Sequence, residues 1–303
     1  MAERVELHLK YRPKTFDELI GYRVLKESLL AAIPRSRTFL FYGPRGCGKT
    51  TIARLIGNHI NVAPIDFCEI DAADNTGIDN ARAIKEAAQY SPLGGKFKIY
   101  IIDECHRLSG AASDSLLKTL ENPPQHCYFV LCTTELQKVS ATMKSRCKCY
   151  EVQPLTEDEQ KFLIKWVCHE EGFKVSPTVR QTIVESCEGI PREILVTLDT
   201  VRGVENDEDA ISLIRSAVHK EVIDLCRALL DQRKWSEVAV ILKALKDDPE
   251  RVRMAILGYM NSVLLSANPK NMELAAGLIK NFQDSYMYIG KAGLTKDCFY
   301  SVT

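Results

Sequence analysis

Residues 43–50 read Gly-Pro-Arg-Gly-Cys-Gly-Lys-Thr and satisfy the phosphate-binding loop pattern G-x-x-x-x-G-K-[ST]. The apolar run Thr38–Tyr42 precedes this loop, and a segment with helical spacing follows it from about Thr50. Glycines let backbone N–H groups turn towards phosphate oxygens, and the N-terminus of a helix adds a favourable potential. A chance glycine-rich turn is the alternative, and the complete spacing with both flanks argues against it. We expect Lys49 to reach the β- and γ-phosphates of a nucleotide and the Thr50 hydroxyl to bind Mg²⁺.

A second apolar run, Lys98–Ile102, ends in the adjacent carboxylates Asp103 and Glu104. Phosphoryl transfer to water needs a ligand for the metal ion and a group that orients the attacking water. We expect Asp103 to hold the Mg²⁺ side of the site and Glu104 to orient and polarise the water. A strand that ends in acidic residues by chance is the alternative, and the phosphate-binding loop upstream disfavours it.

Short apolar runs alternate with amphipathic segments over residues 37–152. Strands that alternate with helices predict a parallel sheet with helices on both faces. From about residue 155 the strand-like runs stop, and helix signals such as the capping box Thr156-x-x-Glu159 follow. We therefore predict an α/β core over residues 1–154, a small helical domain over 155–215 and further helices over 216–303. The runs expected to form strands are Thr38–Tyr42, Ile65–Ile70, Lys98–Ile102, Tyr128–Cys132 and Cys147–Val152.

The composition is that of an ordinary globular protein, with 46% hydrophobic and 26% charged residues among 303. No apolar run approaches the roughly 20 residues that span a bilayer, and the first residues show no signal-peptide pattern. We therefore expect an intracellular protein without a membrane partner. A formal net charge of zero argues against a self-sufficient DNA binder but permits a subunit that touches DNA on one face. Eleven cysteines, mostly in apolar runs and without paired CxxC motifs, predict reduced thiols and no zinc site.

Several further stretches carry a family resemblance. Residues 10–21, Lys-Tyr-Arg-Pro-Lys-Thr-Phe-Asp-Glu-Leu-Ile-Gly, resemble the N-terminal signature of clamp-loader ATPases of the AAA+ class. Residues 103–109 (Asp-Glu-Cys-His-Arg-Leu-Ser) and 116–124 (Leu-Leu-Lys-Thr-Leu-Glu-Asn-Pro-Pro) resemble the bacterial DNA polymerase III gamma/tau subunit in particular. Thr133-Thr134 and Ser145-Arg146-Cys147 follow in the order that this family shows, so the resemblance covers about residues 8–215.

The resemblance implies an AAA+ core, a helical lid and an all-α collar that holds neighbouring subunits in a pentameric ring. It implies an ATP-hydrolysing subunit that opens a sliding clamp and places it on primer–template DNA. Thr133 or Thr134 would be the sensor of the γ-phosphate, Arg192 the second sensor, and Arg146 an arginine finger for a neighbour's ATP, which can be worth about 10³–10⁵ in rate. The ATP-binding residues implied are Tyr11, Arg12, Pro13, Ile20 and Gly21 around adenine and ribose, and Gly43, Pro44, Arg45, Gly46, Cys47, Gly48, Lys49, Thr50, Thr51 and Arg192 around the phosphates.

Each of these assignments has a simpler alternative. Arg12 could be a solvated surface charge, and Thr133 and Thr134 could be ordinary residues at a strand end. Arg192 could pair within the lid, and Arg146 could form a salt bridge within its own subunit.

Two further surfaces follow from the resemblance. Tyr90, Pro92 and Leu93 match a region that inserts apolar side chains into a pocket of the sliding clamp, with an ordinary buried loop as the alternative. Arg82 and Ser109 match positions that face duplex phosphates and position DNA without reading its sequence. A plain surface arginine is the alternative for Arg82.

The chain departs from the gamma/tau pattern between Ile60 and Ile65, where that family carries a four-cysteine zinc module. In its compactness it is also similar to the small subunits of eukaryotic and archaeal loaders or to a virus-encoded loader. We therefore expect ATP and Mg²⁺ but no zinc, in the cytoplasm of a bacterial or virus-infected cell, or in the nucleus if the chain is eukaryotic. The rival functions are another AAA+ DNA motor, of branch-migration or helicase type, and a ring subunit that binds ATP only structurally. The Ser145-Arg146-Cys147 motif argues against the first and the intact Lys49, Asp103, Glu104 and Arg146 against the second.

Overall fold

The computed structural model describes residues 5–74, 77–245, 249–265, 269–284 and 290–302. The chain forms two compact units, Met1–Ile211 and Ser212–Thr303. The division into core, lid and collar stays a prediction. Among the helices of the described residues, none combines the length and the apolar character that a membrane span requires.

The first unit is built on a five-stranded sheet in which every strand pair is parallel, so the predicted fold class is confirmed. The strand order is β2-β3-β4-β1-β5. The strands are β1 (Thr38–Tyr42), β2 (Phe67–Asp71), β3 (Lys98–Asp103), β4 (Cys127–Thr133) and β5 (Lys148–Glu151). The strand predicted to begin at Ile65 begins instead at Phe67, because the 3₁₀ helix η1 (Pro64–Asp66) occupies the preceding residues.

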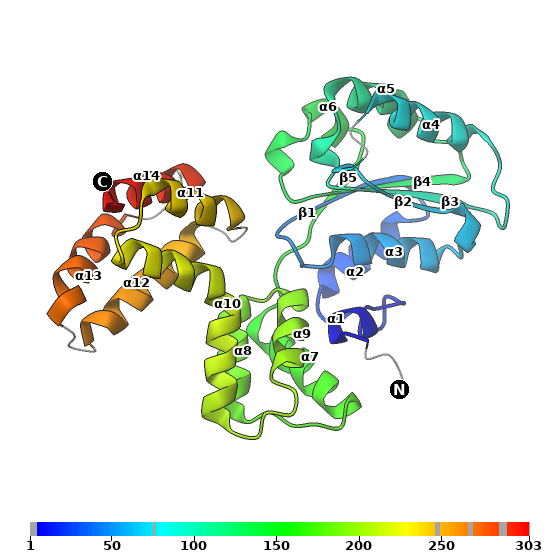
Figure 1. Ribbon diagram of the computed structural model, residues 1–303. Helices are drawn as coiled ribbons and strands as arrows, with labels where there is room; N and C mark the ends of the chain where they lie inside the picture. The colour runs from blue at the N-terminus through cyan, green and yellow to red at the C-terminus, as the bar shows by residue number, and fades with distance from the viewer. Residues whose placement is uncertain (1–4, 75–76, 246–248, 266–268, 285–289, 303) are drawn as a thin grey trace. The chain divides into compact units, whose positions relative to one another are not determined.

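Helices cover both faces of this sheet (Figure 1). On one face lie α2 (Arg23–Ala32) and α3 (Lys49–His59), and on the other lie α4 (Ile78–Gln89), α5 (Gly110–Glu121) and α6 (Ala141–Lys144). Successive side chains of a strand point to opposite faces, so the central strands must be apolar throughout. All seven residues of β4 are buried accordingly.

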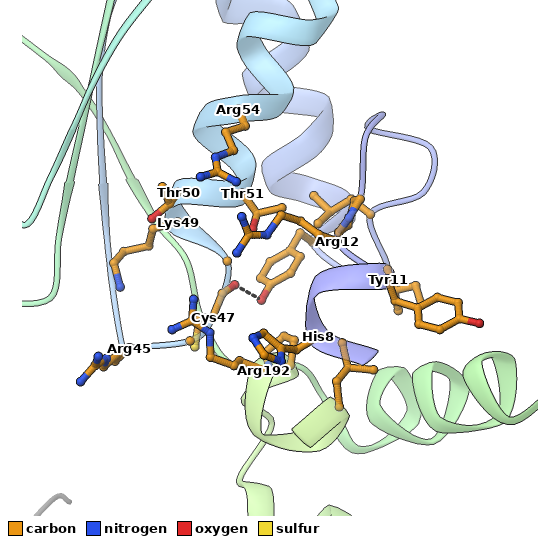
Figure 2. A pocket seen from close by; sticks show the side chains of 18 of the residues that line it. His8, Tyr11, Arg12, Arg45, Cys47, Lys49, Thr50, Thr51, Arg54 and Arg192 are labelled. Atoms are coloured by element: carbon orange, nitrogen blue, oxygen red, sulfur yellow. Dashed lines mark hydrogen bonds between the residues drawn. The ribbon is translucent and has the colours of Figure 1, made fainter. Parts of the chain in front are cut away.

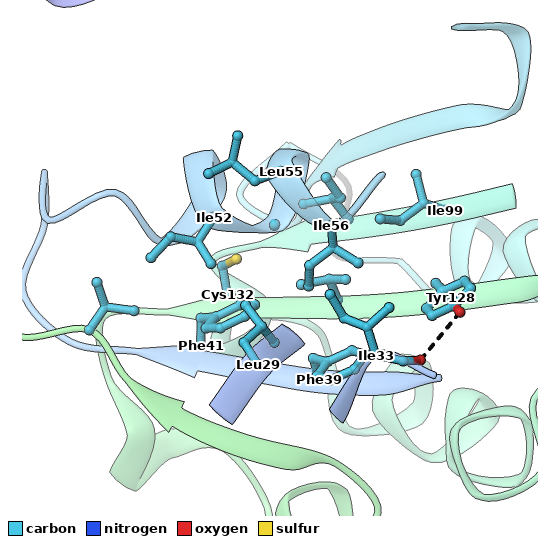
Figure 3. Packing of buried hydrophobic residues seen from close by; sticks show 14 of the residues in the cluster. Leu29, Ile33, Phe39, Phe41, Ile52, Leu55, Ile56, Ile99, Tyr128 and Cys132 are labelled. Atoms are coloured by element: carbon cyan, nitrogen blue, oxygen red, sulfur yellow. Dashed lines mark hydrogen bonds between the residues drawn. The ribbon is translucent and has the colours of Figure 1, made fainter. Parts of the chain in front are cut away.

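The packing of α3 against the sheet determines where the phosphate-binding loop lies. Ile52 and Ile56 of α3 are fully buried against Phe39 and Phe41 of β1 and Tyr128 of β4 (Figure 3). Each such side chain contributes about 1.5–3 kcal/mol to stability when it is removed from water. This burial fixes the N-terminus of α3 directly after the loop that leaves β1.

Three helices follow the sheet within the first unit: α7 (Glu157–Glu170), α8 (Pro177–Cys187) and α9 (Pro191–Thr200). The predicted capping box is confirmed, since Glu159 N donates to Thr156 Oγ1 at 3.4 Å and Thr156 N donates to Glu159 Oε2 at 2.9 Å. The connection from β5 is held at both ends. Val152 N donates to Tyr42 O at 2.7 Å on the sheet side, and Leu155 N donates to Gly189 O at 2.8 Å on the side of the helices. The short helix α1 (Leu7–Lys10) precedes the whole arrangement and contacts α9.

All regular secondary structure among the described residues of the second unit is helical, as predicted for the C-terminal region. It contains α11 (Trp235–Ala244), α12 (Pro249–Leu265), α13 (Pro269–Asn281) and α14 (Gly290–Val302), and the boundary between the two units falls within α10 (Asp207–Leu230). Its core is separate from that of the sheet, with Leu225, Leu229, Ile256 and Phe282 fully buried together.

Candidate nucleotide-binding site

The loop between β1 and α3 owes its shape to glycine. Gly43, Gly46 and Gly48 all have positive φ values, of 142°, 84° and 97°. A Cβ atom on Gly43 would lie 2.2 Å from the carbonyl oxygen of Val152, so no other residue fits there without a shift of the backbone. The Tyr22 hydroxyl donates to the carbonyl of Cys47 at 2.7 Å and holds the far end of the loop (Figure 2).

Lys49 is the first residue of α3, and only 6% of it is exposed to solvent. Its ammonium group donates to the carbonyls of Gly43 at 2.9 Å and Pro44 at 2.8 Å. Burial lowers the pKa of this lysine, and the nearby carboxylate of Glu104 works in the opposite direction. The cation is therefore held inside the loop by groups of its own chain.

Thr50 at the start of α3 and Asp103 at the carboxyl end of β3 bring two oxygen ligands together. The Thr50 hydroxyl donates to Asp103 Oδ2 at 2.7 Å, and Asp103 Oδ1 accepts from the backbone N–H of Glu104 at 3.0 Å. A hydroxyl and a carboxylate in contact form an oxygen-only donor pair, which suits a hard cation such as Mg²⁺. Among the described residues, no group of three or more His, Cys, Asp or Glu side chains is placed to hold a metal ion by itself.

Glu104 has a left-handed backbone with φ of 47°, and its side chain meets the end of β4. Its Oε2 accepts from the Thr134 hydroxyl at 2.9 Å and from the Thr134 backbone N–H at 3.3 Å. Behind it, His106 Nδ1 lies 3.3 Å from Glu104 Oε2 and 2.9 Å from Thr133 Oγ1, and His106 Nε2 lies 3.2 Å from Glu135. Of the two threonines, Thr134 therefore contacts Glu104 directly, while Thr133 is buried beside His106.

One pocket in the first unit gathers most of the predicted site residues (Figure 2). Those that line it are Tyr11, Arg12, Pro13, Ile20, Arg45, Gly46, Cys47, Gly48, Lys49, Thr50, Thr51, Asp103, Glu104 and Arg192. Predicted residues that do not line it are Gly21, Gly43, Pro44, Thr133, Thr134 and Arg146. Gly43 and Pro44 act instead as acceptors for the loop lysine, as described above.

The pocket also contains residues that sequence reasoning missed, namely His8, Leu19, Tyr22, Arg54, Glu69, Asp71, Leu155, Leu163, Pro191 and Leu195. Arg54 could have been found, because it lies one helical turn after Thr50 on the same helix. It forms a two-pronged pair with Glu69, with both N–O distances at 2.7 Å. Burial, together with the charges of Arg54 and Arg192, lowers the pKa of Arg12. The pocket thus contains five Arg or Lys side chains beside four carboxylates, and the cations suit a polyphosphate ligand.

Comparison with known proteins assigns the chain to a family. It is 32% identical over 292 residues to the DNA polymerase III subunit gamma of Buchnera aphidicola subsp. Schizaphis graminum, covering 86% of this chain and 80% of that protein. The chain belongs to the DNA polymerase III gamma/tau family. It is also 33% identical over 219 residues to the gamma/tau subunit of Mycobacterium tuberculosis, covering 64% of this chain but 38% of that protein. It thus spans well under half the length of that gamma/tau subunit.

Two further comparisons concern parts of this gamma/tau chain. Residues 57–156 match a family described as the DNA polymerase III delta subunit. The Thermotoga maritima RuvB Holliday junction branch migration motor is similar in structure, with a TM-score of 0.59 at 21% identity, over 77% of this chain and 85% of that one. This similarity confirms the AAA+ fold expected from the sequence.

In this gamma/tau chain, Arg146 lies away from the pocket and pairs within the chain. Its Nε and Nη2 both lie 3.0 Å from Glu121 Oε2, and its Nη1 donates to the Thr142 carbonyl at 2.8 Å. The intrachain salt bridge named as the alternative is therefore present. The action of Arg146 on a neighbour's nucleotide stays a prediction.

The residues predicted to meet the clamp and DNA lie on other surfaces. Tyr90 and Leu93, which follow α4, are 72% and 78% exposed, so the loop is not a buried one, while Pro92 is half-buried. Arg82 is exposed on α4, with Asp79 at 3.6 Å. Ser109 is the exposed N-cap of α5, where its hydroxyl accepts from Ala112 N at 3.2 Å.

Proposed function

We propose that the chain binds Mg²⁺–ATP in this pocket and hydrolyses it as one subunit of a DNA sliding-clamp loader. The observation that carries the proposal is the arrangement around one phosphate-binding loop of a lysine, a threonine–aspartate pair and a following glutamate. Membership of the gamma/tau family supports the choice of loader over other AAA+ activities.

The loop residues have distinct tasks in this proposal. Thr50 and Asp103 would hold Mg²⁺, which would neutralise the negative charge that develops on the phosphates. When nucleotide binds, the Lys49 ammonium would give up its hydrogen bonds to the carbonyls of Gly43 and Pro44 and donate to the β- and γ-phosphates instead. Arg192, the second residue of α9, lines the same pocket beside Gly46 of the loop and would meet the same phosphates.

Glu104 and Thr134 would act on the attacking water. The Thr134 hydroxyl lies 2.9 Å from Glu104, so one water molecule near this pair can donate to the Glu104 carboxylate and contact the Thr134 hydroxyl. Thr133 has its hydroxyl buried against His106 and the Glu135 backbone. We therefore assign the sensor role to Thr134 and a supporting role to Thr133.

Assembly would complete the site. Arg146 does not line the pocket of its own chain, and its side chain keeps 27% exposure beside Glu121. An arginine finger supplied by a neighbour can raise hydrolysis by about 10³–10⁵. We propose that Arg146 leaves Glu121 to serve the next subunit of a pentameric ring, which makes turnover depend on assembly.

The partner surfaces follow from exposure. Tyr90 and Leu93, with Pro92 between them, would insert into an apolar pocket of the sliding clamp. Arg82 and Ser109 would meet primer–template phosphates without reading base sequence. The relatives are bacterial replication proteins by name, which supports a cytoplasmic location.

Steady-state ATP hydrolysis by the full chain tests the proposal, first alone and then with primer–template DNA and the sliding clamp of the same source. We expect stimulation by the two together, and a loss of about 10²–10⁴ in turnover for Glu104→Gln with nucleotide affinity retained. Glu86→Gln, an exposed carboxylate on α4, is the matched control. Binding without any turnover would favour a purely structural nucleotide, and stimulation by DNA that ignores the clamp would favour another AAA+ motor.

A further inference from the structure

Glu171, the C-cap residue that follows α7, accepts from three donors on one carboxylate. Its Oε1 accepts from Lys10 Nζ at 2.6 Å and from the Tyr11 hydroxyl at 2.7 Å, and its Oε2 lies 2.7 Å from Arg202 Nη2. The side chain is only 6% exposed although it does not line the nucleotide pocket. A carboxylate withdrawn from water to this extent needs such compensation, because desolvation alone is strongly unfavourable.

The donors come from segments that are far apart in the sequence. Lys10 ends α1 and Tyr11 follows it, whereas Arg202 lies just beyond α9. Aromatic contacts hold the donors in place: the Tyr11 ring meets the edge of Trp166 with centroids 5.1 Å apart, and the Arg202 guanidinium lies 5.6 Å from the Phe173 ring. The Tyr11 side chain points away from the phosphate-binding loop, and its hydroxyl lies on the outer side of the wall (Figure 2).

Each segment joined by Glu171 continues into a wall of the pocket. Beyond Tyr11 the chain supplies Arg12 and Pro13, α7 supplies Leu163, and α9 begins with Pro191 and Arg192. The three elements therefore meet the ligand space at one end and Glu171 at the other. The hydrogen bonds from Lys10 and Tyr11, with the charge of Arg202, also lower the pKa of Glu171, so the carboxylate is ionised at neutral pH.

We propose that Glu171 is a positioning residue that ties the N-terminal segment to α7 and α9 and so prolongs the residence of nucleotide in the pocket. The inference rests on the proposed binding of ATP at this pocket. Glu171 acts through Tyr11 and Arg12 on one side and through Arg202 and α9 on the other. Loss of its charge loosens the wall at the adenine end without altering the Mg²⁺ ligands or Glu104.

The test measures nucleotide exchange on the full chain by stopped-flow fluorescence with a methylanthraniloyl derivative of ADP. In Glu171→Gln we expect the dissociation rate constant to rise roughly tenfold, since charge-assisted hydrogen bonds are lost, with little change in association. KM for ATP rises with it, while kcat at saturating ATP stays the same. Glu170→Gln, whose carboxylate lies 3.6 Å from His169 on the same helix, is the matched control and should behave as the unaltered chain.

Tyr11→Phe provides a second and milder variant, because it keeps the ring against Trp166 and removes the hydroxyl. We expect this variant to raise the dissociation rate constant less than Glu171→Gln does. The double variant should show a rise that is less than the combined effect of the two single changes, because both changes remove the same hydrogen bond. Unchanged dissociation in both single variants, with binding by the unaltered chain intact, would overturn this inference and leave the proposed function standing. Failure of the unaltered chain to bind the nucleotide would overturn both.

Discussion

Replacement of Asp66 by alanine should release the turn that carries Tyr90 and Leu93. Asp66 lies in η1 and is 1% exposed, and its two carboxylate oxygens accept from the backbone N–H groups of Leu93 at 2.9 Å and Gly94 at 2.7 Å. Gly94 packs closely on η1, since a Cβ there would meet that of Ala63 at 2.6 Å. The turn is thus held by a charged group from a different part of the chain.

The magnitude follows from these two hydrogen bonds. Bonds to a charged acceptor contribute about 1.5–3 kcal/mol each, and the partial exposure of the turn places this pair near the lower end. We expect Asp66→Ala to reduce the free energy of local opening at residues 93 and 94 by roughly 3 kcal/mol, which corresponds to about 150-fold faster amide exchange. Asp66→Asn, which keeps one acceptor oxygen, should lose less.

Hydrogen exchange followed by mass spectrometry measures the predicted rise in amide exchange in peptides that contain residues 93 and 94. Peptides from β4 serve as the internal reference, because that strand is buried throughout and distant in sequence from η1. Unchanged exchange at residues 93 and 94 in Asp66→Ala would refute the reasoning that this carboxylate orders the turn. If the turn docks on a clamp, the same variant should also weaken that docking while Tyr90 and Leu93 remain in place.

Three other outcomes follow from the contacts of the site and its surroundings. Lys49→Met should abolish detectable nucleotide binding by calorimetry, because it removes the buried cation of the loop while the helix that carries it stays packed. Arg146→Ala should cost less than about 1 kcal/mol in unfolding free energy, because its pair with Glu121 is partly exposed; in the assembled ring it should lower turnover by about 10³ or more, and an equal loss in the isolated chain would contradict action on a neighbour. The hydrogen bonds from Lys10 and Tyr11, with the charge of Arg202, lower the pKa of Glu171. The ionised group therefore stabilises the fold fully above the ordinary carboxylate pKa, and this contribution declines below that pKa until it is lost once the pH has fallen through the lowered value. Urea unfolding at about pH 7 and about pH 3.5 should show a smaller loss of stability in Glu171→Gln than in the unaltered chain.

Most of the sheet could be predicted because buried parallel strands read as continuous apolar runs. The run at Ile65 shows where this reasoning fails. Proline at position 64 favours the first turn of a helix, and Asp66 turns its carboxylate towards a turn nearly thirty residues later, so Ile65 lies in η1 and is 66% exposed. Hydrophobicity alone does not distinguish such a turn from the first residues of a strand.

The site was predictable where a local motif carries it. Lys49, Thr50 and Asp103 belong to short patterns with a defined place at the end of a strand, and the structure brings them together. His8 and Tyr22 also line the pocket, but they reach it through tertiary packing of a segment that precedes the sheet. No spacing rule along the chain encodes that contact, because it depends on how α1 and α2 are placed against later elements.

The connection between β5 and α7 also determines how the nucleotide loop and the following helices can move relative to each other. Val152 is bonded to Tyr42 and lies against Gly43, while Leu155 is bonded to Gly189. The covalent path between these two anchors is Gln153-Pro154. Proline fixes its own φ and narrows the range of the residue before it, so this hinge is stiff and permits rotation in few directions. Any rotation of α7–α9 relative to the sheet would therefore be limited to a narrow range of directions about Gln153-Pro154. Because Val152, at one end of this hinge, lies against Gly43, a change of conformation in the phosphate-binding loop would act directly on the hinge.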